Sequence, residues 1–340
     1  MSPDPADLPA SAATPAELLD WAADPDAGRR LSPLTGSGVL LVDARDAPLT
    51  TAERGRLARW LRQLPCPSIA IAAQPSTLAA ACDTSVTSLD EAAPLLKGIG
   101  QSPQAASVLV QLLRLLPGLS LEDGLVAESM AYAMLQAGPE YQRWLAANRA
   151  AAPVQPQDPG PAVVIERDGD ILRLELNRPS NRNAMSMELR DGLVEGLQLA
   201  LADDSIRQVA IRARGKCFST GGDLSEFGST PDPVSGHLVR GLALPGRLLA
   251  QCAERAEVRV HGACIGSGIE FPAFAGRLVA VADAHFQLPE LRFGLIPGAG
   301  GCVSLSRRIG RQRATWLLLS GKRITARRAL EWGLIDAVVD

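Results

Sequence analysis

The segment CIGSGIEF, residues 264–271, places a serine between two glycines and a glutamate three residues later. Two kinds of chemistry use such residues: nucleophilic attack by Ser267, or proton transfer by Glu270 beside exposed backbone N–H groups. The nucleophile elbow of many serine hydrolases requires G-x-S-x-G, but the residue two positions before Ser267 is Ile265. His261, one of only three histidines, lies in a strand-like stretch, where packing is favoured over the role of a triad base. The sequence therefore disfavours a serine hydrolase.

Glycine-rich turns offer the backbone N–H groups that a reaction at Glu270 would need. Gly266 and Gly268 leave room for a ligand beside the main chain, and a helix start presents N–H groups that no helical carbonyl accepts. The segment FSTGGDL, residues 218–224, is a second strand end with paired glycines. Two such turns can each donate one N–H to the same oxygen, an arrangement that stabilises a developing oxyanion.

Five segments of the second half resemble, in order, the signature blocks of the crotonase (enoyl-CoA hydratase/isomerase) superfamily. They are LNRPSNRNAMS (176–186), FSTGGDL (218–224), GACIGSGIEF (262–271), HFQLPELRFGLIPGAGG (285–301) and TARRALEWGLIDAVV (325–339). The resemblance covers residues 163–340, and it implies an α/β fold whose core is the ββα superhelix of that family.

The resemblance implies a role for each matching residue. The backbone N–H groups of Thr220 and Ser267 form the oxyanion hole, so Ser267 contributes its amide and not its hydroxyl. Glu270 and Glu290, 20 residues apart as in the hydratases, correspond to the two catalytic glutamates. The residues that the resemblance places near the substrate or its coenzyme A arm are Arg182, Gly221, Gly222, Asp223, Gly266 and Gly298.

Two carboxyl groups suit the hydration of an α,β-unsaturated acyl-CoA, since one takes a proton from water and the other protonates Cα. The two N–H groups stabilise the thioester enolate between these steps. The expected activity is that of an enoyl-CoA hydratase, a lyase that uses neither a metal nor a cofactor besides the coenzyme A of its substrate. Isomerisation, C–C bond hydrolysis or dioxygenation on the same scaffold stay open, as does a non-catalytic acyl-CoA-binding subunit. The alternative for each glutamate taken singly is that Glu270 caps a helix and that Glu290 is a surface residue.

Alternating strand and helix patterns must position these residues. The patterns indicate a hairpin at 163–177, strands at 208–214 and 277–283, and helices at 187–203 and 239–254. The hairpin is expected to turn at Asp168 and Gly169. Because strands separated by helices of this length pair in parallel, the patterns themselves predict an α/β fold.

Pro-rich segments divide the rest of the chain. The expected parts are a Pro/Ala-rich arm at 1–35, a first region at 36–150, a Pro-rich linker at 151–162 and the catalytic domain at 163–340. The first region has strand patterns at 38–45 and 68–73 around a helix pattern at 51–64, and only helical patterns after Ser88. Ser120 is the expected N-cap of one of these helices.

Residues 88–148 resemble the helices that follow the GLIDAVV block in other crotonases. The strands before them resemble a crotonase core without its glycine turns and glutamates. We therefore interpret residues 36–150 as a degenerate crotonase half that carries displaced cover helices, with an unrelated helical domain as the alternative. Their long apolar stripe would aggregate if exposed, so we expect these helices to pack on the catalytic half.

Composition narrows the class of protein further. Apolar residues make up 46% of the 340 residues, and a net charge of −3 with a pI of about 5.8 argues against a nucleic-acid partner. The six cysteines form no C-x-x-C pair, which disfavours a zinc site or a disulfide framework. No apolar run reaches the roughly 18 residues of a membrane span. A cytoplasmic homo-oligomer, a trimer or a multiple of it, is the expectation.

Overall fold

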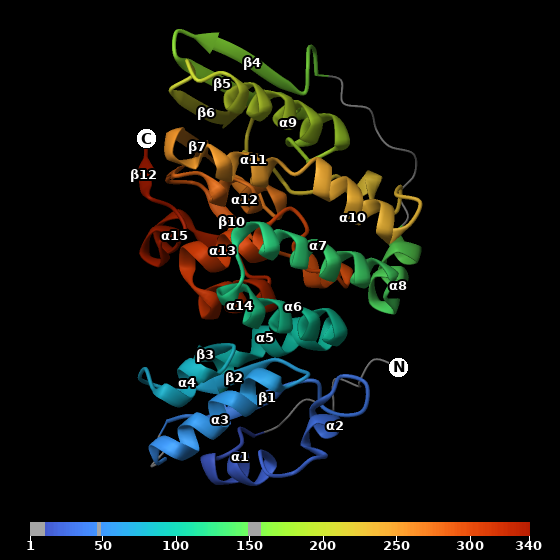
Figure 1. Cartoon of the computed structure of the whole chain (residues 1–340), viewed down its shortest axis with the longest axis vertical. Coiled ribbons are helices and arrows are strands. Elements are labelled where there is room, and N and C mark those ends of the chain that lie inside the picture. Colours follow the sequence, from blue (N-terminus) through green and yellow to red (C-terminus); the bar gives the residue numbers. More distant parts are fainter. Residues whose placement is uncertain (1–10, 46–48, 149–157) are drawn as a thin grey trace. The chain divides into compact units, whose positions relative to one another are not determined.

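The computed structural model describes residues 11–45, 49–148 and 158–340, so much of the expected linker at 151–162 lies outside the described residues. The chain forms two compact units (Figure 1). Unit 1 combines the described residues up to Leu119 with Glu290–Ile296 and Gly310–Lys322. Unit 2 combines Ser120–Pro289, Pro297–Ile309 and Arg323–Asp340. Each unit thus contains residues from both sides of the linker.

Unit 2 is built on a six-stranded sheet with the order β12-β9-β7-β6-β5-β4. Its strands are β4 (Val163–Asp168), β5 (Ile171–Leu176), β6 (Gln208–Ala213), β7 (Ala256–Val260), β9 (Arg277–Val281) and β12 (Ala337–Val339). The β4–β5 pair is the expected antiparallel hairpin, and Gly169 takes a positive φ of 61° in its turn. All other neighbours in this sheet pair in parallel, which confirms the α/β prediction.

A second, smaller sheet in unit 2 carries the segments with the predicted site residues. It has the order β11-β10-β8, with β8 (Ala263–Ile265), β10 (His285–Gln287) and β11 (Ile324–Thr325). The β8 and β10 strands pair in parallel, so the chain leaves both at the same edge. The β8 strand leads directly into the turn at Gly266.

Helices cover these sheets. Unit 2 contains α7 (Leu121–Ala137), α8 (Pro139–Asn148), α9 (Met187–Ala202), α10 (Pro233–Leu242), α11 (Pro245–Gln251), α12 (Ser267–Glu270), α13 (Gly301–Ile309) and α15 (Ala326–Trp332), with 3-10 turns η3 (Pro179–Asn181), η4 (Leu224–Glu226), η5 (Ala253–Arg255) and η6 (Pro272–Phe274). The prediction of a single helix at 239–254 is wrong, because α10 ends at Leu242 and α11 begins at Pro245. Pro245 lacks an N–H and restricts Leu244, whose ψ is 103°, to an extended conformation.

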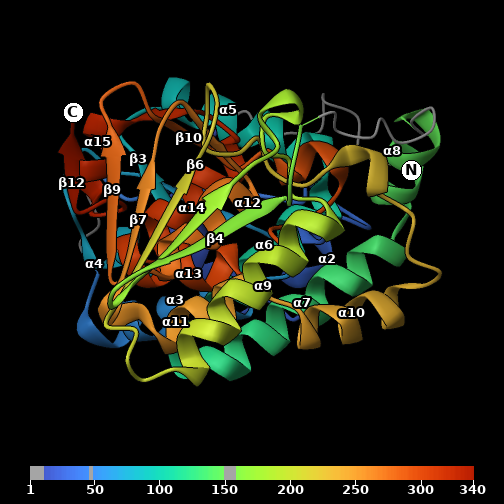
Figure 2. The same ribbon diagram turned by 90° about the horizontal axis from the view of Figure 1, so that it is seen from above.

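The α7 helix belongs to unit 2 although it precedes the linker. Its expected N-cap is confirmed, because the Ser120 hydroxyl accepts a 3.0 Å hydrogen bond from the Asp123 N–H. The helix packs along α10 (Figure 2) and against α13. Elements from before and after the linker therefore share one core in this unit.

Unit 1 contains a three-stranded parallel sheet, β1-β2-β3. Its elements are β1 (Leu40–Asp43), β2 (Ser68–Ile71), β3 (Thr84–Val86), α1 (Pro15–Trp21), α2 (Ala27–Leu31), α3 (Thr51–Gln63), α4 (Thr77–Ala81), α5 (Leu89–Gln101), α6 (Pro103–Leu115), η2 (Leu116–Gly118), η7 (Glu290–Phe293) and α14 (Arg311–Ser320). The strands expected at 38–45 and 68–73 and the helix at 51–64 are confirmed, whereas β3 was not predicted. Two short helices, α1 and α2, lie within the segment expected to be an arm.

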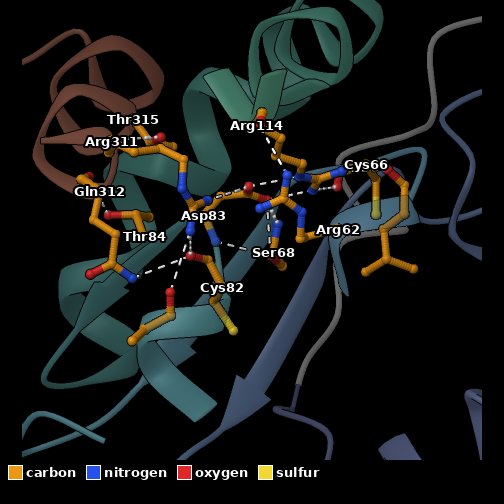
Figure 3. A network of polar contacts seen from close by, with 12 residues as sticks. Arg62, Cys66, Ser68, Cys82, Asp83, Thr84, Arg114, Arg311, Gln312 and Thr315 are labelled. Carbon is orange, nitrogen blue, oxygen red and sulfur yellow. Dashed lines mark hydrogen bonds and ion pairs between the residues drawn. The ribbon is translucent and has the colours of Figure 1, made fainter. Parts of the chain in front are cut away.

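A buried ion cluster joins the sheet of unit 1 to two of its helices (Figure 3). Asp83, 1% exposed, binds the Arg114 guanidinium of α6 at 2.6 Å and that of Arg311 of α14 at 3.0 Å. Its carboxylate also accepts hydrogen bonds from the N–H and hydroxyl of Ser68. Each charged group has an oppositely charged partner and further hydrogen bonds. These interactions offset the free-energy cost of burying the charges in the core.

Residues 88–148 thus pack on segments of the second half, as expected from their apolar stripe. In unit 1, α5 and α6 contact α14, and in unit 2, α7 contacts α10 and α13. None of the helices in the described ranges combines the length and the apolar character that crossing a membrane requires.

Candidate active site

The two glycine turns that the sequence singled out lie side by side in unit 2. Ser219, in the first turn, bridges to Cys264 of β8, and the Ile265 N–H donates to the Ser219 carbonyl at 3.0 Å. A side chain at Gly268 would lie 2.6 Å from the Ser219 carbonyl oxygen. A side chain at Gly221, whose φ is +93°, would lie 2.9 Å from the Ile265 carbonyl oxygen. Glycine is therefore required at both positions for the turns to approach each other.

The two predicted oxyanion donors differ in their surroundings. Ser267 is the first residue of α12, behind Gly266 with φ 51° and ψ −124°, and no described hydrogen bond uses its N–H. The Thr220 N–H donates to the Arg182 carbonyl oxygen at 3.2 Å. The Ser267 amide is thus available to a ligand in this structure. The Thr220 amide would have to leave the Arg182 carbonyl, or donate to it and to the ligand at once.

The Ser267 hydroxyl does not belong to a hydrolytic triad in this structure. Its oxygen is buried, and it has no hydrogen-bond partner among the described residues. Two of the three histidines are hydrogen-bonded elsewhere: His237 to the Ser129 hydroxyl and His261 to the Gly215 carbonyl. This geometry agrees with the view that Ser267 matters for its backbone.

The Arg182 carbonyl that faces Thr220 is held by an unusual backbone conformation. Arg182 and Asn183 both have positive φ, 56° and 52°, which is rare for residues other than glycine. The Asn183 side chain stabilises this conformation, because it accepts from the Arg178 N–H and donates to the carbonyls of Arg214 and Cys217. Arg182 itself is exposed, so its guanidinium is accessible to a ligand.

The remaining residues of the first turn are held by local contacts. The Asp223 carboxylate accepts hydrogen bonds from the Asn181 amide at 3.0 Å and from the Ser225 N–H at 2.9 Å, so it organises the loop. Gly222 faces the Phe227 ring, which a side chain at this glycine would approach to 3.0 Å. Phe227 in turn packs edge-on against Trp144 of α8, with ring centroids 5.8 Å apart.

Glu270 ends α12 and lies 3% exposed in unit 2. Its Oε2 accepts hydrogen bonds from the N–H groups of Ala299 at 2.8 Å and Gly301 at 3.1 Å. A backbone hydrogen bond from Gly298 also reaches the carboxyl, so three backbone groups within residues 298–301 hold it. Burial raises the pKa of Glu270 to about 7, while hydrogen bonds from the backbone oppose this shift. Such a group can take or give a proton near neutral pH.

The PGAGG segment has glycines because α7 and Glu270 approach it closely. A side chain at Gly298 would lie 2.6 Å from the Tyr132 ring, and one at Gly301 would lie 2.6 Å from the Glu270 Cγ. Gly298, predicted to lie near the substrate, thus also forms the seat for α7.

A second buried carboxyl that sequence reasoning did not select binds the same turn. Glu128 of α7 is 2% exposed, and its only signal in the sequence is an acidic residue on the buried face of an apolar helix. The donors to Glu128 are the N–H groups of Gly300 (2.6 Å), Cys302 (2.8 Å) and Val303 (3.3 Å). Burial, and then the charge of Glu270, raise the pKa of Glu128 to about 8.

Glu290, the other predicted catalytic glutamate, belongs to unit 1. It begins the 3-10 turn η7, is 9% exposed, and its carbonyl accepts a hydrogen bond from the Leu295 N–H at 3.1 Å. Glu290 is therefore a buried residue and not a surface residue. In unit 2, by contrast, the structure brings together Thr220, Ser267 and Glu270 through the paired turns.

The chain is similar to known proteins of one family. The sequence model of the family described as enoyl-CoA hydratase/isomerase matches residues 166–340. The 2,3-dehydroadipyl-CoA hydratase of Escherichia coli (strain K12) is 35% identical over 52% of this chain and 68% of its own length. The 1,2-epoxyphenylacetyl-CoA isomerase of the same organism is 33% identical over 50% of this chain and 66% of its own length. The chain thus spans about two thirds of each relative.

The fold is also found among solved structures. A crystal structure described as an enoyl-CoA hydratase/isomerase from Mycobacterium abscessus has 30% sequence identity and a TM-score of 0.50. The match covers 53% of this chain and 71% of that one. The catalytic half of the sequence therefore has the crotonase fold, and the chain belongs to the crotonase (enoyl-CoA hydratase/isomerase) superfamily.

Proposed function

We propose that this protein adds water to an α,β-unsaturated acyl-CoA. The observation that carries the proposal is the Glu270 carboxyl, which is buried and held by backbone N–H groups, in the helix that starts at the Ser267 amide. Burial raises the pKa of this carboxyl to about 7. A base or acid with a pKa near the working pH is the most effective in proton transfer.

In the proposed reaction the N–H groups of Ser267 and Thr220 bind the thioester carbonyl oxygen. Glu270 and Glu290 act together: one accepts a proton from water as its oxygen attacks Cβ, and the other donates a proton to Cα. Electrons move from the C=C bond onto the carbonyl oxygen and back, so the oxyanion is stabilised only while the enolate exists. The product is a 3-hydroxyacyl-CoA, and the protonation states of the two glutamates are restored by exchange with solvent.

The test is the loss of the conjugated thioester absorbance with crotonyl-CoA and with longer or aromatic enoyl-CoAs. Glu270→Gln and Glu290→Gln should each lower kcat by about 10²- to 10⁴-fold, because each removes a proton-transferring group. Glu122→Gln, at an exposed position in α7, is the matched control and should retain activity. Unchanged turnover in both catalytic variants would refute the proposal.

A second candidate is double-bond isomerisation. It is favoured by the likeness to an isomerase, since one carboxyl group such as that of Glu270 suffices to carry a proton from one carbon of an enoyl thioester to another. Product mass separates the two candidates, since hydration adds one water and isomerisation leaves the mass unchanged.

The finer expectations from the sequence belong to the same proposal. The enzyme would require no cofactor besides the coenzyme A of its substrate, and it would work in the cytoplasm as a trimer or a multiple of it. Residues 36–150 would be a degenerate crotonase half, of which α7 and α8 serve as cover helices within unit 2. Light scattering of the purified protein tests the oligomeric state, and dialysis against a chelator tests the absence of a metal requirement.

A further inference from the structure

Five consecutive backbone N–H groups, those of residues 299–303, are divided between two buried carboxyl groups. Glu270 accepts hydrogen bonds from the first and third of them. Glu128 accepts hydrogen bonds from the second, fourth and fifth. The two side chains come from α12 and α7, on opposite sides of the linker in the sequence, and they alternate along one turn.

The turn is the start of α13, whose first N–H groups have no acceptor within the helix. Both carboxylates satisfy these donors, and the positive end of the helix dipole favours negative charge there. Two ionised carboxyl groups in one water-poor site nevertheless repel each other, so ionisation of one raises the proton affinity of the other.

Helix packing alone does not explain an acidic residue at position 128. The other buried residues of α7 are uncharged: Gly124, Leu125, Ser129 and Leu135. Burying a carboxyl group costs free energy that an apolar side chain in the same place would not. The two oxygens of Glu128 instead accept from three N–H groups, more than the single side-chain oxygen of a Ser or Asn N-cap satisfies. Glu128 therefore holds the same turn as Glu270.

Other titratable groups near Glu128 come from three helices. His237 and Arg240 of α10 and Arg247 of α11 line a small cavity of about 20 Å³ next to it. Tyr132 of α7 lies under the Arg240 guanidinium, 4.6 Å from its ring centroid. Burial lowers the pKa of Arg240, and the charges of Tyr132 and Glu128 oppose this shift. The Glu128 carboxyl thus interacts with the charge of Arg240 as well as with that of Glu270.

We propose that Glu128 is a positioning residue for Glu270. It fixes the turn at 299–303 that anchors Glu270 Oε2, so the two carboxyl groups share one site and are coupled. The consequence for turnover rests on the proposed function, but the coupling between the two carboxyl groups does not. A cover helix would in this way hold the acid–base group of the catalytic half in place as well as shield it.

The charge-removing variant is Glu128→Gln. It keeps the size of the side chain, but its amide group can accept hydrogen bonds through one atom only and presents donors at the other. Because the charge of Glu270 raises the pKa of Glu128, Glu270 ionises first, and the ionisation of Glu128 adds a second, higher step to its titration curve. Glu128→Gln should remove that upper step. Glu122→Gln, on the same helix but exposed and paired with Arg247 at 3.0 Å, should leave the pKa of Glu270 unchanged.

The experiment is a carboxyl ¹³C NMR titration of the full chain labelled at glutamate, with Glu270→Gln used to assign the signal. A single-step Glu270 curve in Glu128→Gln, with both steps kept in Glu122→Gln, supports the proposal. A Glu270 curve that Glu128→Gln leaves unchanged would show that Glu128 is only a structural cap and would overturn it. Glu270→Gln should in turn lower the Glu128 midpoint, because it removes the charge that raises the pKa of Glu128.

The wild-type protein supplies a test even if Glu128→Gln does not fold. Two coupled carboxyl groups titrate in two shared steps, so each signal should show an inflection at both midpoints. Single-step curves for both glutamates would refute the coupling. In turnover assays, Glu128→Gln should lower kcat more than it changes KM, because the turn that anchors Glu270 loses an acceptor. If no enoyl-CoA is converted by the wild type, the proposed function fails while the titration still decides the role of Glu128.

Discussion

Replacing Gly301 by alanine should displace the Glu270 carboxyl directly. The added methyl carbon would lie 2.6 Å from the Cγ and 2.9 Å from the Oε2 of Glu270, and 2.8 Å from the Cβ of Pro297. Carbon atoms pack at about 3.5–4.0 Å, so Glu270 or the turn must move by about 1 Å. A shift of that size would stretch the hydrogen bonds of 2.8 and 3.1 Å that hold Oε2 towards or beyond their limit.

The expected magnitudes follow from this displacement. Overpacking of a tight site costs about 1–3 kcal/mol of stability. A misplacement of about 1 Å at a reacting group can cost about 10²-fold in rate. Enoyl-CoA turnover in Gly301→Ala should therefore fall about 100-fold, with kcat affected more than KM, and the melting temperature should drop by several degrees.

Gly241→Ala makes the same chemical change where nothing lies within 4 Å of the new methyl group, near the end of α10. It should keep full activity and be neutral or slightly stabilising, because alanine favours a helix. The assays are the loss of thioester absorbance and thermal unfolding followed by circular dichroism. If Gly301→Ala were as active and as stable as Gly241→Ala, the packing of Glu270 against this turn would be refuted.

Two further predictions concern stability. Burial raises the pKa of Glu270 to about 7 from an unfolded value near 4.5. Between these two pH values the folded state binds more protons than the unfolded state. The contribution of Glu270 to the free energy of unfolding should therefore fall as pH rises from 4.5 to 7 and level off above that. Urea denaturation from pH 4.5 to 8 should show a weaker decline in Glu270→Gln, and identical slopes would contradict the assignment. Asp83→Asn should cost about 3–5 kcal/mol, because it leaves Arg114 and Arg311 buried with a neutral partner. Asp24→Asn, in an exposed ion pair with Arg30, is its control and should change the free energy of unfolding by less than about 1 kcal/mol; equal effects would refute the argument from burial.

Local sequence determined the features that depend on neighbouring residues. The β4–β5 hairpin follows from alternating apolar residues around Gly169, and the α7 N-cap follows from Ser120. The glycine turns and the acidic residue at Glu270 also stand out in the sequence, because close backbone approach and general acid–base chemistry permit few residue types. The roles of Thr220 and Glu290 stay predictions, because they depend on a bound substrate.

Only the tertiary structure decided how distant segments share a core. The break between α10 and α11 could have been read from Pro245, but the assignment of α14 to unit 1 could not. Arg311 meets Asp83 across 228 positions in the sequence, and Glu128 meets the amides of α13 across more than 170. Helical periodicity shows which face of α7 is buried, but not what lies opposite it. The partner of a buried charge is set by long-range packing, and for Glu128 that partner is the turn that also holds Glu270.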